Sequence, residues 1–184
     1  MATKIMLVRH AEKPDRDSVP YGVSRKGIRN KECLQVRGWQ RAGALIGLFA
    51  PPNGQNHLAV AQPEFLYASK PLRRRGSRRP LQTILPLGEK LGIEINTRFP
   101  RFDFAEMLEE VYLLDGVVLI CWQREYIPEI ALKILDGKET VPSDWPENRY
   151  DMVWVFDLDR STNQYHFKQV PQGLLAGDLA TPII

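Results

Sequence analysis

The chain has 184 residues, a formal net charge of +3 and 43% hydrophobic residues. This length and hydrophobic content suit one domain with a full core, so we expect a single domain over residues 1–184. Its apolar runs are too short for a membrane span or for a signal peptide. The composition therefore argues against a membrane protein and favours a cytoplasmic one.

The cysteine and histidine content argues against a disulfide framework and against a metal site. The chain has two cysteines, and Cys121 lies inside an apolar run, where a reduced and buried thiol is the ordinary state. Its three histidines, at positions 10, 57 and 166, form no metal-binding motif such as HExxH. We expect no metal, no organic cofactor and a reducing compartment.

The first part of the chain is predicted to form a strand, a loop and a helix. Residues 4–8 are apolar and are followed by charged residues, which indicates a short buried strand. Residues 13–36 show no clear period, and loops of that length are usually functional, so we expect a lid or a pocket wall there. Residues 37–49 have apolar residues at helical spacing and precede two prolines that end the helix.

The middle of the chain continues the alternation of strands and helices. Residues 65–69 are predicted to form a second short strand, and residues 77–91 a helix that ends at Gly92. Residues 93–99 alternate between apolar and polar side chains, which is typical of a strand.

The last part of the chain completes the pattern. Residues 104–114 carry an apolar stripe at helical spacing, and residues 116–122 are apolar throughout, as in a central strand that is covered on both faces. A helix is expected over 124–135, then a strand over 150–159 with 165–170 as its hairpin partner. This order predicts an α/β fold, a three-layer α/β/α sandwich with a mostly parallel central sheet.

Basic residues follow three of the predicted strands, at the carboxyl ends where open α/β sheets bind their ligands. Arg9 and His10 follow the first strand, the arginine-rich segment 73–79 follows the second, and Arg124 follows the strand 116–122. Guanidinium groups bind phosphate oxygens in pairs, and a neutral imidazole can attack phosphorus and hold the phosphoryl group. The pattern predicts a phosphate pocket with His10 as its nucleophile.

Three other functions fit the sequence less well. No aromatic residues are interleaved with the arginines of segment 73–79, so we expect solvated or substrate-gate charges there and no nucleic-acid binding. A cysteine phosphatase needs an arginine six positions after its nucleophile, but Ile127 stands there relative to Cys121. No glycine-rich phosphate loop is present, so nucleotide-dependent phosphoryl transfer has no support.

The segments "LVRHAE" (7–12), "YASKP" (67–71) and "SRRPLQT" (77–83) together resemble the histidine phosphatase superfamily, also called the phosphoglycerate mutase-like family. The resemblance implies that His10 accepts the phosphoryl group and that Arg9 and Arg79 bind it. Ala11 stands in place of the glycine in the family's Arg-His-Gly motif. The resemblance also implies a phosphatase acting on a small phosphorylated substrate.

The chain departs from this family after the strand 116–122, where a second catalytic histidine is usual. It has "CWQREYIP" there, and Arg124 occupies the place of the histidine in the family's Trp-x-His variant. An arginine can still bind a phosphate oxygen. Two functions therefore stay open: a phosphatase that works through a phosphohistidine, and a catalytically impaired binder of phosphorylated or other anionic ligands.

The resemblance also implies a carboxylic acid that protonates the leaving group, on or before the helix that precedes this strand. The candidates are Asp103, Glu106, Glu109 and Glu110. Glu106 is the first choice because it opens the predicted helix, whereas Glu109 and Glu110 have the pattern of solvated charges. The substrate and the oligomeric state are not predicted.

Overall fold

The structure, a computed structural model, describes residues 1–15, 19–55, 59–71 and 76–184. His57 and the three arginines at 73–75 lie outside these described residues. The strands are β1 (Lys4–Arg9), β2 (Phe65–Ala68), β3 (Ile95–Asn96), β4 (Val117–Trp122), β5 (Met152–Asp159) and β6 (Gln164–Pro171). The helices are α1 (Val36–Phe49), α2 (Arg79–Leu91), α3 (Phe104–Leu113) and α4 (Ile127–Leu135).

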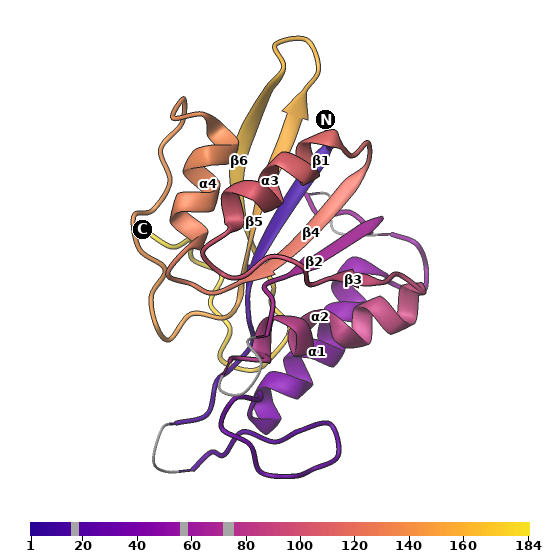
Figure 1. The fold of residues 1–184 in the computed structure, drawn as a ribbon, viewed down its shortest axis with the longest axis vertical. Coiled ribbons are helices and arrows are strands. Elements are labelled where there is room, and N and C mark those ends of the chain that lie inside the picture. Colours follow the sequence, from indigo (N-terminus) through magenta and orange to yellow (C-terminus); the bar gives the residue numbers. More distant parts are fainter. Residues whose placement is uncertain (16–18, 56–58, 72–75) are drawn as a thin grey trace.

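The strands form one six-stranded sheet in the order β3-β2-β4-β1-β5-β6 (Figure 1). β1 and β4 pair in parallel, as do β4 and β2, and β2 and β3. β5 runs antiparallel to β1 and forms a hairpin with β6. The predicted mixed α/β fold with a mostly parallel sheet is therefore confirmed, and the carboxyl ends of β1, β2 and β4 meet at one edge.

Each face of the sheet is covered by two helices, because side chains alternate between the faces of a strand. In β1, Ile5 and Leu7 pack into the core beneath α3 and α4, whereas Met6 and Val8 pack into the core beneath α1 and α2. Figure 1 shows these two helical layers on opposite sides of the sheet. Cys121 belongs to the second core, where burial raises the pKa of its thiol.

Two predicted elements are shorter than the pattern suggested. The strand expected over 93–99 contracts to the two residues of β3, which lies at the sheet edge and pairs on one side with β2 alone. The helix expected from residue 124 begins at Ile127, with a proline in its first two positions. The residues just before it are thereby left free to form a turn at the carboxyl end of β4.

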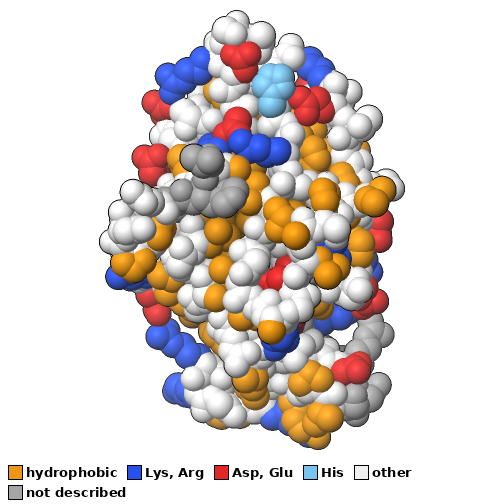
Figure 2. All heavy atoms as spheres, turned by 180° about the vertical axis from the view of Figure 1, so that it is seen from behind, with side chains coloured by type: hydrophobic (Ala, Val, Ile, Leu, Met, Phe, Trp, Pro, Cys, Tyr) orange, Lys and Arg blue, Asp and Glu red, His pale blue; other side chains and the backbone are white. Residues whose placement is uncertain are grey.

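The surface away from the viewer of Figure 1 has no stripe of a single charge among its described residues. Figure 2 shows basic side chains beside acidic ones on that face, with apolar side chains between them. A face that binds nucleic acid would gather its basic residues instead.

Among the described residues, no helix has the length and apolar character needed to cross a membrane.

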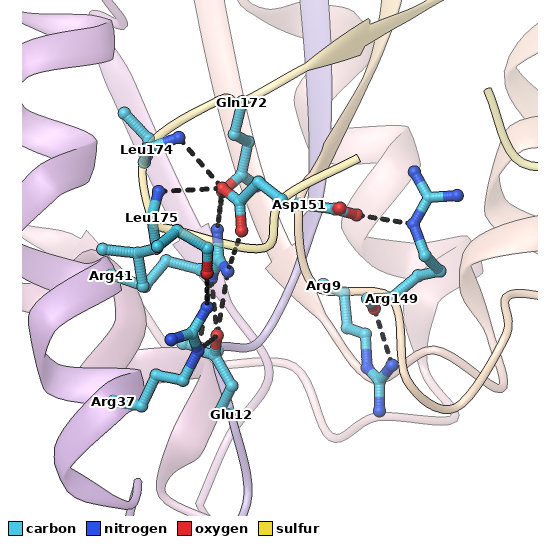
Figure 3. A network of polar contacts seen from close by, with 12 residues as sticks. Arg9, Glu12, Arg37, Arg41, Arg149, Asp151, Gln172, Leu174 and Leu175 are labelled. Atoms are coloured by element: carbon cyan, nitrogen blue, oxygen red, sulfur yellow. Dashed lines mark hydrogen bonds and ion pairs between the residues drawn. The ribbon is translucent and has the colours of Figure 1, made fainter. Parts of the chain in front are cut away.

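A buried ion-pair network links the segment after β1 to α1 and to the C-terminal segment (Figure 3). Arg41 of α1 is 2% exposed, and its Nη2 lies 2.8 Å from Glu12 Oε1 and 2.7 Å from Asp178 Oδ1. Its Nη1 donates to Gln172 Oε1 at 3.0 Å. Arg37, on the exposed side, adds an ion pair to Glu12 at 3.4 Å. The network therefore holds the chain two residues beyond His10.

We expect Arg41→Ala to lower the free energy of unfolding by about 3–5 kcal/mol, because it leaves two buried carboxylates without their cation. Arg37→Ala removes an exposed partner of the same Glu12 and should cost less than about 1 kcal/mol. Urea denaturation of both variants measures the difference. Equal losses would show that the buried network does not stabilise the fold.

Candidate active site

A cavity of about 1060 Å³ opens at the carboxyl ends of β1, β2 and β4. Its wall comes from the end of β1, the loop 13–36, the start of α2, the turn after β4 and the segment before β5. Four residues singled out from the sequence line it together, although they lie far apart in the chain: Arg9, His10, Arg79 and Arg124.

His10 is buried at the floor of this cavity, with 5% of its surface exposed. Its backbone N–H donates to the carbonyl of Trp122 at 3.0 Å, which continues the pairing of β1 with β4. Its ring Nδ1 lies 2.8 Å from the carbonyl oxygen of Ala11. Because a carbonyl only accepts, Nδ1 carries the hydrogen, and Nε2 keeps the free lone pair.

The surroundings of His10 keep its ring neutral. Burial lowers its pKa to about 3, and the positive charges of Arg9, Arg79 and Lys13 act in the same direction. The hydrogen bond to Ala11 opposes this shift but does not outweigh it. At neutral pH the ring is therefore an uncharged base in a positively charged cavity, which is the form that attacks phosphorus.

Arg9 is held in place by the segment before β5. Its Nη1 donates to the carbonyls of Pro146, Glu147 and Arg149 at 2.9, 2.7 and 2.7 Å, and its guanidinium lies 3.9 Å from the ring centroid of Tyr150. Burial lowers its pKa to about 10, so it remains a cation at neutral pH. Its buried Nε has no hydrogen-bond partner among the described residues.

Arg79 lies at the start of α2 and lines the same cavity, and its charge helps to lower the pKa of His10. Its Nη2 is 4.0 Å from a carboxylate oxygen of Glu32, and its buried Nε also has no partner in the described part of the chain. Thr83 fixes this arrangement, because its Oγ1 donates to the Arg79 carbonyl at 2.7 Å and accepts the Ala11 N–H at 2.8 Å. Arg9 and Arg79 thus bring two guanidinium groups to the cavity that His10 lines, and guanidinium groups bind phosphate oxygens in pairs.

Arg124 lines the same cavity but is held by its neighbours. Its Nη1 donates to the Trp145 carbonyl at 2.9 Å and lies 3.4 Å from Asp144, while its Nε lies 3.7 Å from Glu125. Burial is the main cause that lowers the pKa of Arg9, and Tyr150 raises it. The positive charge of Arg124 lowers it further. It therefore adds positive charge to the cavity while its hydrogen bonds go partly to the protein.

Sequence reasoning missed Gln123 and Tyr150, which also line the cavity. Gln123 directly follows β4 and is 7% exposed. Its Nε2 donates to Ser69 Oγ at 2.8 Å, and its buried Oε1 has no donor among the described residues. Its place immediately after a central strand was the one available signal. Tyr150 gave none, because only the tertiary structure brings its ring against Arg9.

The proton donor expected from the sequence is not brought to the cavity. Glu106 is an exposed residue in the first turn of α3 and does not line it. The carboxylates that do line it are Asp15, Glu32, Glu125 and Glu147. Hydrogen bonding to Lys13 lowers the pKa of Glu147 and keeps it ionised. The sequence favoured Glu106 because it opens the helix, whereas Glu125, which lines the cavity, lies in the turn after β4.

His10 is the only histidine that lines the cavity among the residues described. His166 lies on β6, where its Nδ1 is 2.8 Å from Glu139. The same residues contain no group of three or more His, Cys, Asp or Glu side chains arranged to hold a metal ion.

Searches of protein-family models and of the curated proteins return no match. Solved structures do share the fold. The protein histidine phosphatase SixA, complexed with tungstate, superimposes with a TM-score of 0.57 over 92% of this chain and 97% of its own, at 16% identity. A mycobacterial glucosyl-3-phosphoglycerate phosphatase superimposes with a TM-score of 0.56 over 95% of this chain and 100% of its own, at 13% identity.

A third similar structure is a histidine-to-alanine mutant of a phosphoserine phosphatase from Entamoeba histolytica in complex with phosphoserine. Its TM-score is 0.53, over 91% of this chain and 95% of its own, at 11% identity. The chain therefore has the fold of the histidine phosphatase superfamily, as the motifs around His10 and Arg79 had indicated. At these identities the comparisons establish the fold.

We expect nitrogen NMR of the His10 ring to show a hydrogen on Nδ1 and none on Nε2 from about pH 8 down to about pH 5. The reason is that its pKa of about 3 lies well below the ordinary value of about 6.5. His10→Ala identifies the signal by its disappearance. Titration of this signal near pH 6.5 would show that the ring is not buried among positive charges.

Proposed function

We propose that the chain is a phosphatase that hydrolyses a phosphomonoester through a phosphohistidine at His10. One observation carries the proposal: the neutral His10 ring lines one cavity together with the three arginines Arg9, Arg79 and Arg124. A phosphoryl group bound by these guanidinium groups has its phosphorus within reach of Nε2. The structures that share the fold support it, since they include phosphatases with tungstate or phosphoserine bound.

In the first step the Nε2 lone pair of His10 attacks phosphorus, and the bond from phosphorus to the leaving oxygen breaks. Arg9 and Arg79 stabilise the charge on the remaining phosphoryl oxygens. The attack places a positive charge on the ring, and the hydrogen bond from Nδ1 to the Ala11 carbonyl offsets part of it. In the second step water attacks phosphorus, and the bond to Nε2 breaks, which restores the neutral ring.

The leaving oxygen must gain a proton in the first step, and the attacking water must lose one in the second. A single carboxyl group can serve both steps. We assign this role to Glu125, because it lines the cavity and its charge acts on both Arg9 and Arg79, opposing the effect of burial on their pKa values. Glu106 lies outside the cavity lining and is the weaker candidate.

A second function is favoured by one observation, the arginine at position 124 in a cavity where His10 is the only histidine among the described residues. A permanently charged arginine binds an anion but cannot exchange a proton during turnover. On this alternative the chain binds phosphorylated or other anionic ligands without hydrolysing them.

We place the protein in the cytoplasm, because both of its cysteines are free and buried.

We expect rapid quench with a radiolabelled phosphomonoester to trap an acid-labile, base-stable phosphoprotein. His10→Ala should abolish this phosphoprotein and lower kcat by at least about 10³-fold. His166→Ala is the matched control and should leave both unchanged, because His166 lies on β6 with Glu139. Absence of a phosphoprotein, with binding of inorganic phosphate intact, would support the binding protein instead.

We expect Glu125→Gln to lower kcat by about 10²-fold or more, as loss of a general acid–base group does. Glu106→Gln makes the same chemical change on α3, outside the cavity lining, and should leave kcat unchanged. Steady-state phosphate release from para-nitrophenyl phosphate and from an alkyl phosphate measures both. The reverse result would return the proton-donor role to Glu106.

A further inference from the structure

Three exposed cations that line the cavity have no ion pair among the described residues: Lys31, Lys70 and Arg101. The cavity's other long cations, apart from the buried Arg9, are paired: Lys13 with Glu147, Arg79 with Glu32 and Arg124 with Asp144. Lys31 belongs to the loop 13–36. Lys70 follows β2, and Arg101 lies in the connection between β3 and α3. Backbone hydrogen bonds fix the main chain of these last two residues, and their charges are available to a ligand.

Lys70 and Arg101 lie on one side of the cavity although 31 positions separate them in sequence. The backbone N–H of Lys70 donates to the carbonyl of Phe99 at 2.7 Å, two residues before Arg101. The carbonyl of Arg101 in turn accepts the indole N–H of Trp122 at 2.9 Å. The ends of β2 and β4 thus hold both cations on the same wall.

The backbone that carries Lys70 lies two strands away from the backbone that carries His10. β4 lies between β2, which precedes Lys70, and β1, which precedes His10. Two strand spacings amount to roughly 10 Å, the length of a small metabolite. The cavity volume of about 1060 Å³ also greatly exceeds what one phosphate group needs.

Gln123 lies between these two regions, at the end of β4. Its Oε1 is buried and has no donor among the described residues, while its Nε2 is held by Ser69. The hydrogen bond to Ser69 fixes the side chain of Gln123 between the two regions. The cavity is therefore lined by the proposed phosphate site, by Gln123 and by the two cations of this wall.

We propose that Lys70 and Arg101 form a subsite for a second anionic group, so that the substrate is a phosphomonoester that also carries a carboxylate or a second phosphate. The subsite rests on the proposed function for its account of the first phosphate, but its binding preference can be measured without turnover.

The experiment uses calorimetry on the His10→Ala protein with two matched pairs of ligands. Phosphoserine and phosphoethanolamine differ by a carboxylate, and fructose 1,6-bisphosphate and fructose 6-phosphate differ by a phosphate. We expect the doubly anionic ligand to bind about tenfold more tightly in at least one pair, because charge-assisted hydrogen bonds are strong. The pair that shows the preference identifies the second group.

The variants locate the preference. Lys70→Ala and Arg101→Ala should each reduce it, the double substitution should abolish it, and Lys70→Arg should restore it. Arg98→Ala is the matched control, because Arg98 is near in sequence but pairs with Glu110 and does not line the cavity. His10→Asn replaces His10→Ala if the latter does not fold.

No preference in either pair, or a preference that survives the double substitution, would overturn the subsite. Phosphate release by the wild-type protein is measured in parallel. Its absence, together with a preference that depends on Lys70 and Arg101, would overturn the phosphatase proposal and leave the subsite standing. The two failures are therefore distinguishable.

Discussion

The parallel pairing of β1 with β4 is the constraint on which the rest of the site depends. The two strands stay in register from Lys4 opposite Val117 to Arg9 opposite Trp122, and the N–H of His10 continues the ladder to the Trp122 carbonyl. Because both strands end at the same level, the segments that follow them lie close together. His10 follows β1, and the turn that begins with Gln123 follows β4.

Electrostatics then determines what this region can do. The cavity collects guanidinium groups around a buried imidazole, and their field together with burial keeps the ring neutral. Arg9 tolerates burial because three carbonyls from the segment before β5 accept its hydrogen bonds. The Glu12–Arg41–Asp178 network supports the other flank by anchoring the chain just beyond His10. An anion is the ligand that such an arrangement stabilises most.

Local patterns predicted most of the fold, since apolar periodicity reports which face of an element is buried. They overestimated β3, because its alternation could not reveal that the strand lies at an edge with a single partner. They could not decide which carboxylate faces the cavity, because a helical stripe shows which residues are exposed but not which loop lines a cavity. Glu125, in the turn that precedes α4, lines the cavity, whereas Glu106 does not.

By itself, the sequence determined the alternation of strands and helices, the core, and the placement of Arg9, His10 and Arg124 at strand ends, because these depend on local spacing. Only the tertiary structure decided which nitrogen of His10 is free, since that depends on the Ala11 carbonyl. It also decided that Lys70 shares a wall with residues of the β3–α3 connection and that Gln123 keeps an acceptor without a donor among the described residues. Such properties arise from contacts between distant segments, and no local pattern encodes them.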